Sequence, residues 1–190
     1  MALITSEGRS KGRPLTRVFC VTGPESSGKT TLARSLASHF SGSWLPEYAR
    51  YYLTSPEYDE EALHKISREQ YARECAFVRS DPHIGFIDTD LINIRIWWDV
   101  RFGRVPDWID SSLLNQQKRY YLLLKPDLPW QDDPLRDQTL DRDYLFTQHK
   151  ELLERFSLPY EVVHGVGQER YQCAIAKVGR LLDMNKTVED

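Results

Sequence analysis

The sequence has little cysteine and no two cysteines spaced as C-x-x-C. Its three cysteines, Cys20, Cys75 and Cys173, lie far apart in a chain of 190 residues. This spacing favours neither a disulfide framework nor a zinc site, and free thiols in a reducing compartment are the simplest interpretation. We therefore expect a cytoplasmic protein that folds around an apolar core, for which this length is sufficient.

Long apolar runs and an excess of basic charge are also absent. No segment approaches the roughly 20 apolar residues that span a bilayer, and the N-terminus lacks the apolar core of a signal peptide. The net charge of −3 provides no basic surface for nucleic acid. We expect neither a membrane nor a nucleic-acid partner, a flexible tail over residues 1–14 and a single domain over residues 15–186.

The clearest motif is the glycine-rich stretch at residues 23–30, GPESSGKT, which fits the phosphate-binding pattern G-x-x-x-x-G-K-[ST]. An apolar run at 18–21 precedes it, and Leu32, Leu36 and Phe40 follow on one helical face. Strand, loop and helix in this order place backbone N–H groups and a helix N-terminus around a polyphosphate. The predicted cofactor-binding residues are Gly23, Pro24, Glu25, Ser26, Ser27, Gly28, Lys29, Thr30 and Thr31.

The residue types of this loop and of a later strand predict a site for ATP and Mg²⁺. Lys29 provides a positive charge for the β- and γ-phosphates, and Thr30 provides a hydroxyl for the metal. Asp88 follows a second apolar run, as the metal-binding acid of such sites does. The guanine-recognition pattern N-K-x-D is missing, which disfavours a GTPase switch and favours ATP or a permissive base site.

Apolar runs alternate with helical periodicity along the rest of the chain. This alternation predicts a five-stranded parallel sheet with helices on both faces, the α/β fold of P-loop NTPases and nucleoside or nucleotide kinases. A lid is expected at about residues 127–140, and the chemistry is expected at the carboxyl ends of the strands. The strands are predicted at about 17–22, 44–46, 84–87, 120–124 and 160–163. Helices are predicted up to about 40 and at about 48–53, 56–79, 91–102, 107–117, 141–156 and from 168 onward.

Three acids at predicted strand ends could serve phosphoryl transfer. Glu47 could orient the acceptor hydroxyl and take its proton, or it could interact with the dipole of the next helix. Asp90 could share the metal with Asp88, contact a substrate hydroxyl, or cap the following helix. Which of the three acts as the base stays open.

Two arginines and a tryptophan complete the predicted site. Arg50, one helical turn after Glu47, could face the acceptor or pair with an acid. In the predicted lid, Arg136 could contact the phosphates and stabilise charge in the transition state. Trp130 could stack on a substrate ring, or it could be a buried anchor for the loop. The histidines lack metal-ligand spacing, and no role is assigned to them.

Several strings together resemble the ribosylnicotinamide kinase domain of NadR-type proteins, within the P-loop kinase and AAA-domain ATPase class. They are GPESSGKT at 23–30, EYAR at 47–50, FIDTD at 86–90, LLLK at 122–125 and PWQDDPLR at 129–136, and ERY at 169–171 also fits. The resemblance covers about residues 17–182. It implies that ATP phosphorylates the 5′-hydroxyl of nicotinamide riboside to nicotinamide mononucleotide in NAD salvage. It also implies that the residues with catalytic and metal-binding roles are Lys29, Thr30, Glu47, Asp88, Asp90 and Arg136.

Two alternatives are kept beside this resemblance. One is a P-loop kinase for another nucleoside or small alcohol, and the other is an ATP-binding regulatory ATPase. Relatives of the NadR type carry an adenylyltransferase domain and sometimes a helix-turn-helix ahead of the kinase, and the H-x-G-H motif of the former is missing here. We therefore expect the kinase activity without DNA binding or dinucleotide synthesis, and the sequence does not indicate the oligomeric state.

Overall fold

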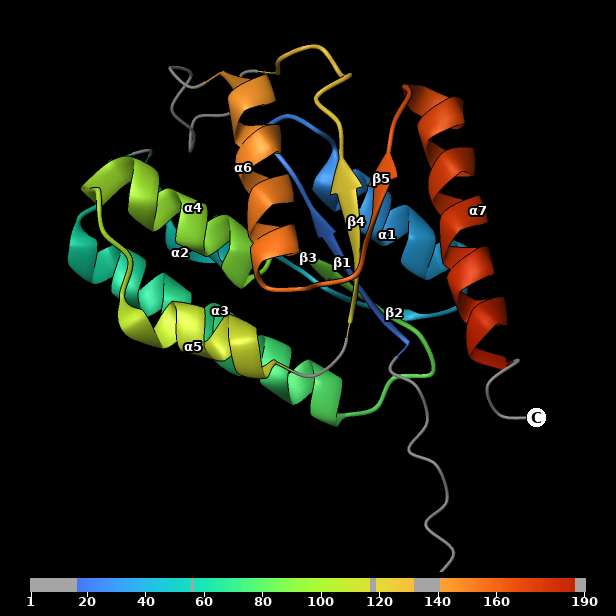
Figure 1. Ribbon diagram of the computed structural model, residues 1–190, viewed down its shortest axis with the longest axis horizontal. Helices are drawn as coiled ribbons and strands as arrows, with labels where there is room; N and C mark the ends of the chain where they lie inside the picture. The colour runs from blue at the N-terminus through green and yellow to red at the C-terminus, as the bar shows by residue number, and fades with distance from the viewer. Residues whose placement is uncertain (1–16, 56, 117–118, 132–140, 187–190) are drawn as a thin grey trace, which may run out of the picture.

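The fold is a five-stranded parallel sheet between two layers of helices (Figure 1). The computed structural model describes residues 17–55, 57–116, 119–131 and 141–186. The strand order is β2-β3-β1-β4-β5, and every neighbouring pair is parallel. The predicted sheet is therefore confirmed. The strands are β1 Val18–Thr22, β2 Ser43–Leu45, β3 Gly85–Asp88, β4 Tyr120–Leu124 and β5 Tyr160–Val163.

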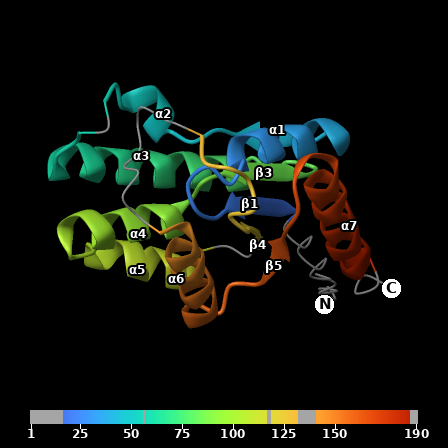
Figure 2. The same cartoon turned by 90° about the horizontal axis from the view of Figure 1, so that it is seen from above.

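The helices divide between the two faces of the sheet because successive strand residues point in opposite directions. Val18 and Cys20 of β1 pack with α3 to α6, whereas Phe19 and Val21 pack with α1 and α7. Figure 2 shows these two groups of helices from above. Within the described ranges, no helix is both long and apolar enough to cross a membrane. The helices are α1 Lys29–His39, α2 Ala49–Tyr52, α3 Glu60–Arg79, α4 Leu91–Phe102, α5 Asp107–Asn115, α6 Arg142–Arg155 and α7 Gly167–Lys186.

The start of α3 differs from the prediction. The sequence predicted a helix from about residue 56, but the helix begins at Glu60, and Asp59 caps it by accepting a hydrogen bond from the Ala62 N–H at 2.8 Å. The Ser55 hydroxyl donates to the Glu57 carbonyl at 3.0 Å. Both Asp and Ser are good N-caps. Asp59 caps α3 because it directly precedes the amphipathic segment that forms the helix.

The register of the central strands brings the predicted site residues to one edge of the sheet. Val21 pairs with Asp88, and Leu45 pairs with Ile87. The carboxyl ends of β1, β2 and β3 therefore lie side by side, and the residues that follow these strands are the glycine loop, Glu47 and the segment after Asp88. This is the edge where ligands bind in open parallel sheets.

Candidate active site

The glycine loop between β1 and α1 needs its glycines for a physical reason. Gly23 has φ 138°, and a Cβ there would lie 2.8 Å from the Leu124 carbonyl oxygen. Gly28 has φ 80° and precedes the first residue of α1. The N-terminus of α1 has no side-chain cap and no acidic residue in its first turn. Its first backbone N–H groups, which have no acceptor within the helix, can therefore bind an anion, as the motif predicts.

Lys29 lies folded against its own loop. Its ammonium donates to the carbonyls of Gly23 at 2.9 Å and Pro24 at 2.8 Å, and the side chain is buried. The Ser27 hydroxyl also donates to the Pro24 carbonyl, at 2.7 Å. A positive charge is thus held within the loop that is built to receive phosphates.

Asp88, the last residue of β3, is fully buried with 0% exposure. No described residue makes a hydrogen bond of normal geometry with either of its oxygens. Burial, together with the nearby Glu47, raises the pKa of Asp88 to about 6, and Thr30, Lys29 and Arg50 oppose this rise. A buried carboxylate without hydrogen-bond partners is costly in free energy, so this acid fits a cation ligand.

Glu47 and Arg50 form an ion pair beside Asp88. Glu47 is buried, and its Oε2 lies 3.2 Å from the Arg50 Nε. Of the two interpretations of Arg50, the pairing with an acid is the one that the structure shows. Both acids lie at the same edge of the sheet, because Leu45 pairs with Ile87 and each acid follows this last pair of the two strands within two positions.

Asp90 caps α4, which is one of the alternatives considered for it. Its Oδ1 accepts from the Ile92 N–H at 3.1 Å, and its Oδ2 accepts from the Tyr121 hydroxyl at 2.6 Å. The side chain is fully buried. Both oxygens are engaged inside the protein, so the cap is the role that the structure shows, and a contact of Asp90 with substrate or metal stays a prediction.

The first part of the predicted lid lies against the glycine loop. The Ser26 hydroxyl donates to the Gln131 carbonyl at 3.1 Å. Trp130 is half-buried, and its indole Nε1 is buried without a hydrogen-bond partner among the described residues. This burial is compatible with an anchor for the loop, and stacking on a substrate stays a prediction. Arg136 lies outside the described residues, as does the rest of the lid from 132 to 140.

A buried polar network that the sequence did not indicate joins the glycine loop to α4 and α6. The Asn93 amide nitrogen donates to the Gly23 carbonyl at 3.1 Å and to the His149 Nε2 at 3.0 Å, while its oxygen accepts from Thr22. The His149 Nδ1–H donates to the Leu145 carbonyl at 2.7 Å. His149 lies on the apolar stripe of α6, and this position is the only feature of the sequence that indicates a buried side chain.

The buried His149 makes the free energy of unfolding depend on pH in the acid range. Burial, together with the charge of Lys29, lowers the pKa of His149 to about 3. Between about pH 6.5 and pH 3 the unfolded chain therefore binds a proton that the folded state excludes, and the free energy of unfolding falls as the pH falls. The contribution approaches about 1.4 kcal/mol per pH unit.

We expect His149→Gln to flatten this acid limb between pH 6 and pH 4 in urea denaturation. The matched control is His83→Gln, because His83 is solvent-exposed and its change should leave the slope as it is. An unchanged slope in His149→Gln contradicts the prediction.

Arg170 joins three loops at the carboxyl edge of the sheet. Its guanidinium donates to the carbonyls of Ser27, Gly165 at 2.7 Å and Lys125 at 2.9 Å, and it lies 3.6 Å from Asp127. Arg170 therefore ties the glycine loop to the ends of β4 and β5. Its contacts come from segments up to 143 residues away, which no local pattern reveals.

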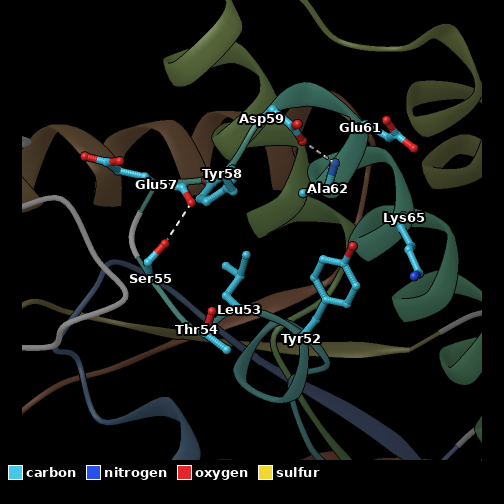
Figure 3. A pocket seen from close by; sticks show the side chains of 10 residues that line it. All are labelled: Tyr52, Leu53, Thr54, Ser55, Glu57, Tyr58, Asp59, Glu61, Ala62 and Lys65. Atoms are coloured by element: carbon cyan, nitrogen blue, oxygen red, sulfur yellow. Dashed lines mark hydrogen bonds between the residues drawn. The ribbon is translucent and has the colours of Figure 1, made fainter.

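A hollow of about 650 Å³ lies between α2 and the start of α3 (Figure 3). None of the predicted site residues lines it. The ammonium of Lys65 lies 4.9 Å from the centre of the Tyr52 ring on its wall. We therefore assign this hollow no part in the site. It is lined by Tyr52, Leu53, Thr54, Ser55, Glu57, Tyr58, Asp59, Glu61, Ala62 and Lys65.

A glycine loop between a central strand and a helix, with an acid at the end of the neighbouring parallel strand, defines a P-loop nucleotide-binding fold. The profile of the AAA domain family matches residues 18–170, and the chain belongs to this family. It is 28% identical over 152 residues to the trifunctional NAD biosynthesis/regulator protein NadR of Escherichia coli, covering 76% of this chain and 37% of that protein. It is 27% identical over 161 residues to NadR of Salmonella typhimurium, covering 78% and 38%.

Solved structures share the fold. A NadR protein in complex with NR superimposes with a TM-score of 0.71 at 22% identity, over 87% of this chain and 49% of that one. A deoxyadenosine kinase from M. mycoides superimposes with a TM-score of 0.58 at 11% identity, over 86% and 99%. The P-loop kinase-like fold and the resemblance to NadR are thereby confirmed. The chain spans less than half the length of the curated relatives named above.

Proposed function

We propose that this chain is an ATP-dependent small-molecule kinase that phosphorylates the 5′-hydroxyl of nicotinamide riboside to give nicotinamide mononucleotide. The observation that supports it best is Asp88, a buried acid beside Lys29 and Thr30 whose two oxygens have no hydrogen-bond partner of normal geometry among the described residues. The likeness to proteins named for NAD biosynthesis supports the choice of acceptor.

The proposal gives a role to each group. The amides at the start of α1 and the Lys29 ammonium bind the phosphates of ATP and neutralise charge that develops on them. Glu47, beside Asp88 at the carboxyl edge, orients the acceptor hydroxyl and takes its proton. The Glu47–Arg50 ion pair holds that carboxylate in place. Arg136 of the lid remains a proposal from the resemblance.

Magnesium fits the same residues. Asp88 and the Thr30 hydroxyl offer oxygen ligands, which Mg²⁺ prefers. Among the described residues there is no cluster of three or more metal-ligating side chains, and Mg²⁺ at kinase sites takes few protein ligands beside water and phosphate. When bound, the ion would neutralise charge on the phosphates. The pKa of Asp88, raised to about 6 by burial, also favours a nearby cation at neutral pH.

The first experiment is a kinase assay over a panel of nucleosides with MgATP. We expect nicotinamide riboside to be turned over best, and Glu47→Gln to lower kcat about 10²–10⁴-fold, because it removes the proton acceptor. The control Glu161→Gln removes a carboxylate on β5 that pairs with Lys177 at 2.7 Å, and it should retain activity.

The panel also separates the rival functions. Preferred turnover of another nucleoside or alcohol would replace the substrate and leave the kinase in place. ADP release that is independent of any acceptor, and unaffected by Glu47→Gln, would point to a regulatory ATPase and overturn the proposal.

A further inference from the structure

One buried side chain bridges the two strand ends that carry the site acids. Gln70 lies on α3 with 1% exposure. Its Oε1 accepts a hydrogen bond from the Tyr48 N–H at 2.9 Å, and its Nε2 donates to the Thr89 carbonyl at 3.0 Å. Tyr48 directly follows Glu47, and Thr89 directly follows Asp88. A single amide group therefore fixes the backbone immediately after both acids.

The sheet does not provide this link. The pairing of β2 with β3 ends where Leu45 meets Ile87, two residues before Glu47. The second strand is only three residues long and lies at the edge of the sheet. The two hydrogen bonds of Gln70 continue the connection between the strand ends beyond the last pair of the ladder.

The backbone that Gln70 holds on the Asp88 side is strained. Thr89 has φ 67°, a left-handed conformation that is unfavourable for a β-branched residue. Such a conformation costs about 1–3 kcal/mol and persists only when its surroundings enforce it. The Thr89 N–H donates to the Val21 carbonyl at 3.2 Å, and its own carbonyl accepts from Gln70. The residue after Asp88 is thus held from both sides.

The buried ion pair of Glu74 and Arg119 orients the Gln70 amide. Its Nε2 also donates to the Glu74 Oε1 at 3.1 Å, and the other carboxylate oxygen of Glu74 accepts from Arg119 at 2.8 Å. The Glu74 carboxylate turns the NH₂ group of Gln70 toward itself and Thr89. The Gln70 oxygen is thereby directed to the Tyr48 N–H.

We propose that Gln70 is a positioning residue, which holds Glu47 and Asp88 in the mutual arrangement that phosphoryl transfer requires. The inference rests on the proposed function for the roles of the two acids, and on hydrogen bonds alone for the link between their strand ends. Gln70 itself touches neither substrate nor nucleotide. Loss of the link should displace the Glu47 and Asp88 carboxylates by up to about 1 Å, and a misplacement of this size lowers the rate about 10²-fold.

The test compares Gln70→Met with Ser67→Ala. Methionine keeps the length and flexibility of glutamine and removes all three hydrogen bonds, the two to the strand ends and the one to Glu74. Ser67 is also buried on α3, one turn earlier, and accepts from the Trp98 indole at 3.0 Å, without contact to a strand end. We expect Gln70→Met to lower kcat about 10²-fold with a smaller change in the KM for ATP, and Ser67→Ala to stay within about threefold of the wild type. Equal kcat values in the two variants, at equal folded fraction, would overturn the proposal.

Amide hydrogen exchange at Tyr48 gives a readout that does not depend on the reaction. We expect the Tyr48 N–H to lose protection in Gln70→Met and to keep it in Ser67→Ala, since its acceptor is removed only in the former. Retained protection in Gln70→Met contradicts the link even if the chain phosphorylates no nucleoside, in which case basal MgATP hydrolysis replaces the kinase rate. If Gln70→Met does not fold, Gln70→Glu keeps the acceptor for Tyr48 and loses the donor to Thr89. It should then retain protection at Tyr48 with a lowered rate, and wild-type kinetics in that variant would overturn the proposal.

Discussion

Lys29→Met is expected to lower kcat/KM for phosphoryl transfer by about 10³-fold, which corresponds to about 4 kcal/mol of transition-state stabilisation. The ammonium is held inside the glycine loop by the Gly23 and Pro24 carbonyls. It therefore needs little reorganisation to meet developing charge on the phosphates. Initial rates over a matrix of ATP and acceptor concentrations give the value.

The matched control is Lys177→Met on α7. Lys177 is also a largely buried lysine with a close oxygen partner, Glu161 at 2.7 Å, but it does not contact the loop. We expect its variant to keep kcat/KM within about twofold. If Lys29→Met retains more than a tenth of the wild-type kcat/KM, the assignment of the loop as the phosphate site is wrong.

Arg119→Met is expected to lower the free energy of unfolding by about 3–5 kcal/mol, because it leaves a buried charge without its partner. Arg119 and Glu74 are both almost fully buried and lie 2.8 Å apart beneath the sheet. Burial raises the pKa of Glu74 to about 7 while Arg119 opposes that rise. Urea denaturation at pH 8, where the orphaned carboxylate is least able to take up a proton, gives the largest effect.

The double variant with Glu74→Leu and Arg119→Met distinguishes the cost of the unpaired carboxylate from the other effects of losing Arg119. It should recover about half or more of the lost stability, because the unpaired carboxylate is removed as well. Arg104→Met, which breaks an exposed pair with Glu60, should cost about 1 kcal/mol or less. A double variant as unstable as Arg119→Met would contradict the account.

The alternation of strands and helices could be predicted from the sequence because it depends on local composition. Apolar runs of four or five residues, such as 18–22 and 120–124, lie between helices of clear periodicity, and both faces of the sheet are covered. The glycine loop was predictable for the same reason, since its backbone geometry depends on residues eight positions apart at most. The end of β3 at Asp88 followed from the apolar run before it.

The polar connections of the site could not be predicted in this way. Gln70, Asn93 and Arg170 look like ordinary helix residues in the sequence. The backbone partners that connect them to the site, Thr89, Gly23 and Ser27, lie 19, 70 and 143 residues away in the chain. Only the folded arrangement shows that they bind the backbone around the site.

Asp90 shows a related limit. Its position after a strand fits both a metal-site acid and a helix cap, and these differ in the direction of the side chain. The hydroxyl of Tyr121, 31 residues later in the chain, donates to Asp90 and holds its side chain in the direction of a helix cap. Two acids only two residues apart, Asp88 and Asp90, therefore lie in different environments, one without hydrogen-bond partners and one with both oxygens occupied.

The place of β1 in the middle of the sheet has a consequence for how the chain folds during synthesis. Val18 pairs with Gly85 on one side, and Phe19 pairs with Tyr120 on the other. About a hundred further residues must therefore be synthesised after β1 before both of its neighbours exist. Non-local pairing of this kind slows folding, so the glycine loop is fixed between its neighbouring strands long after its own residues have emerged from the ribosome.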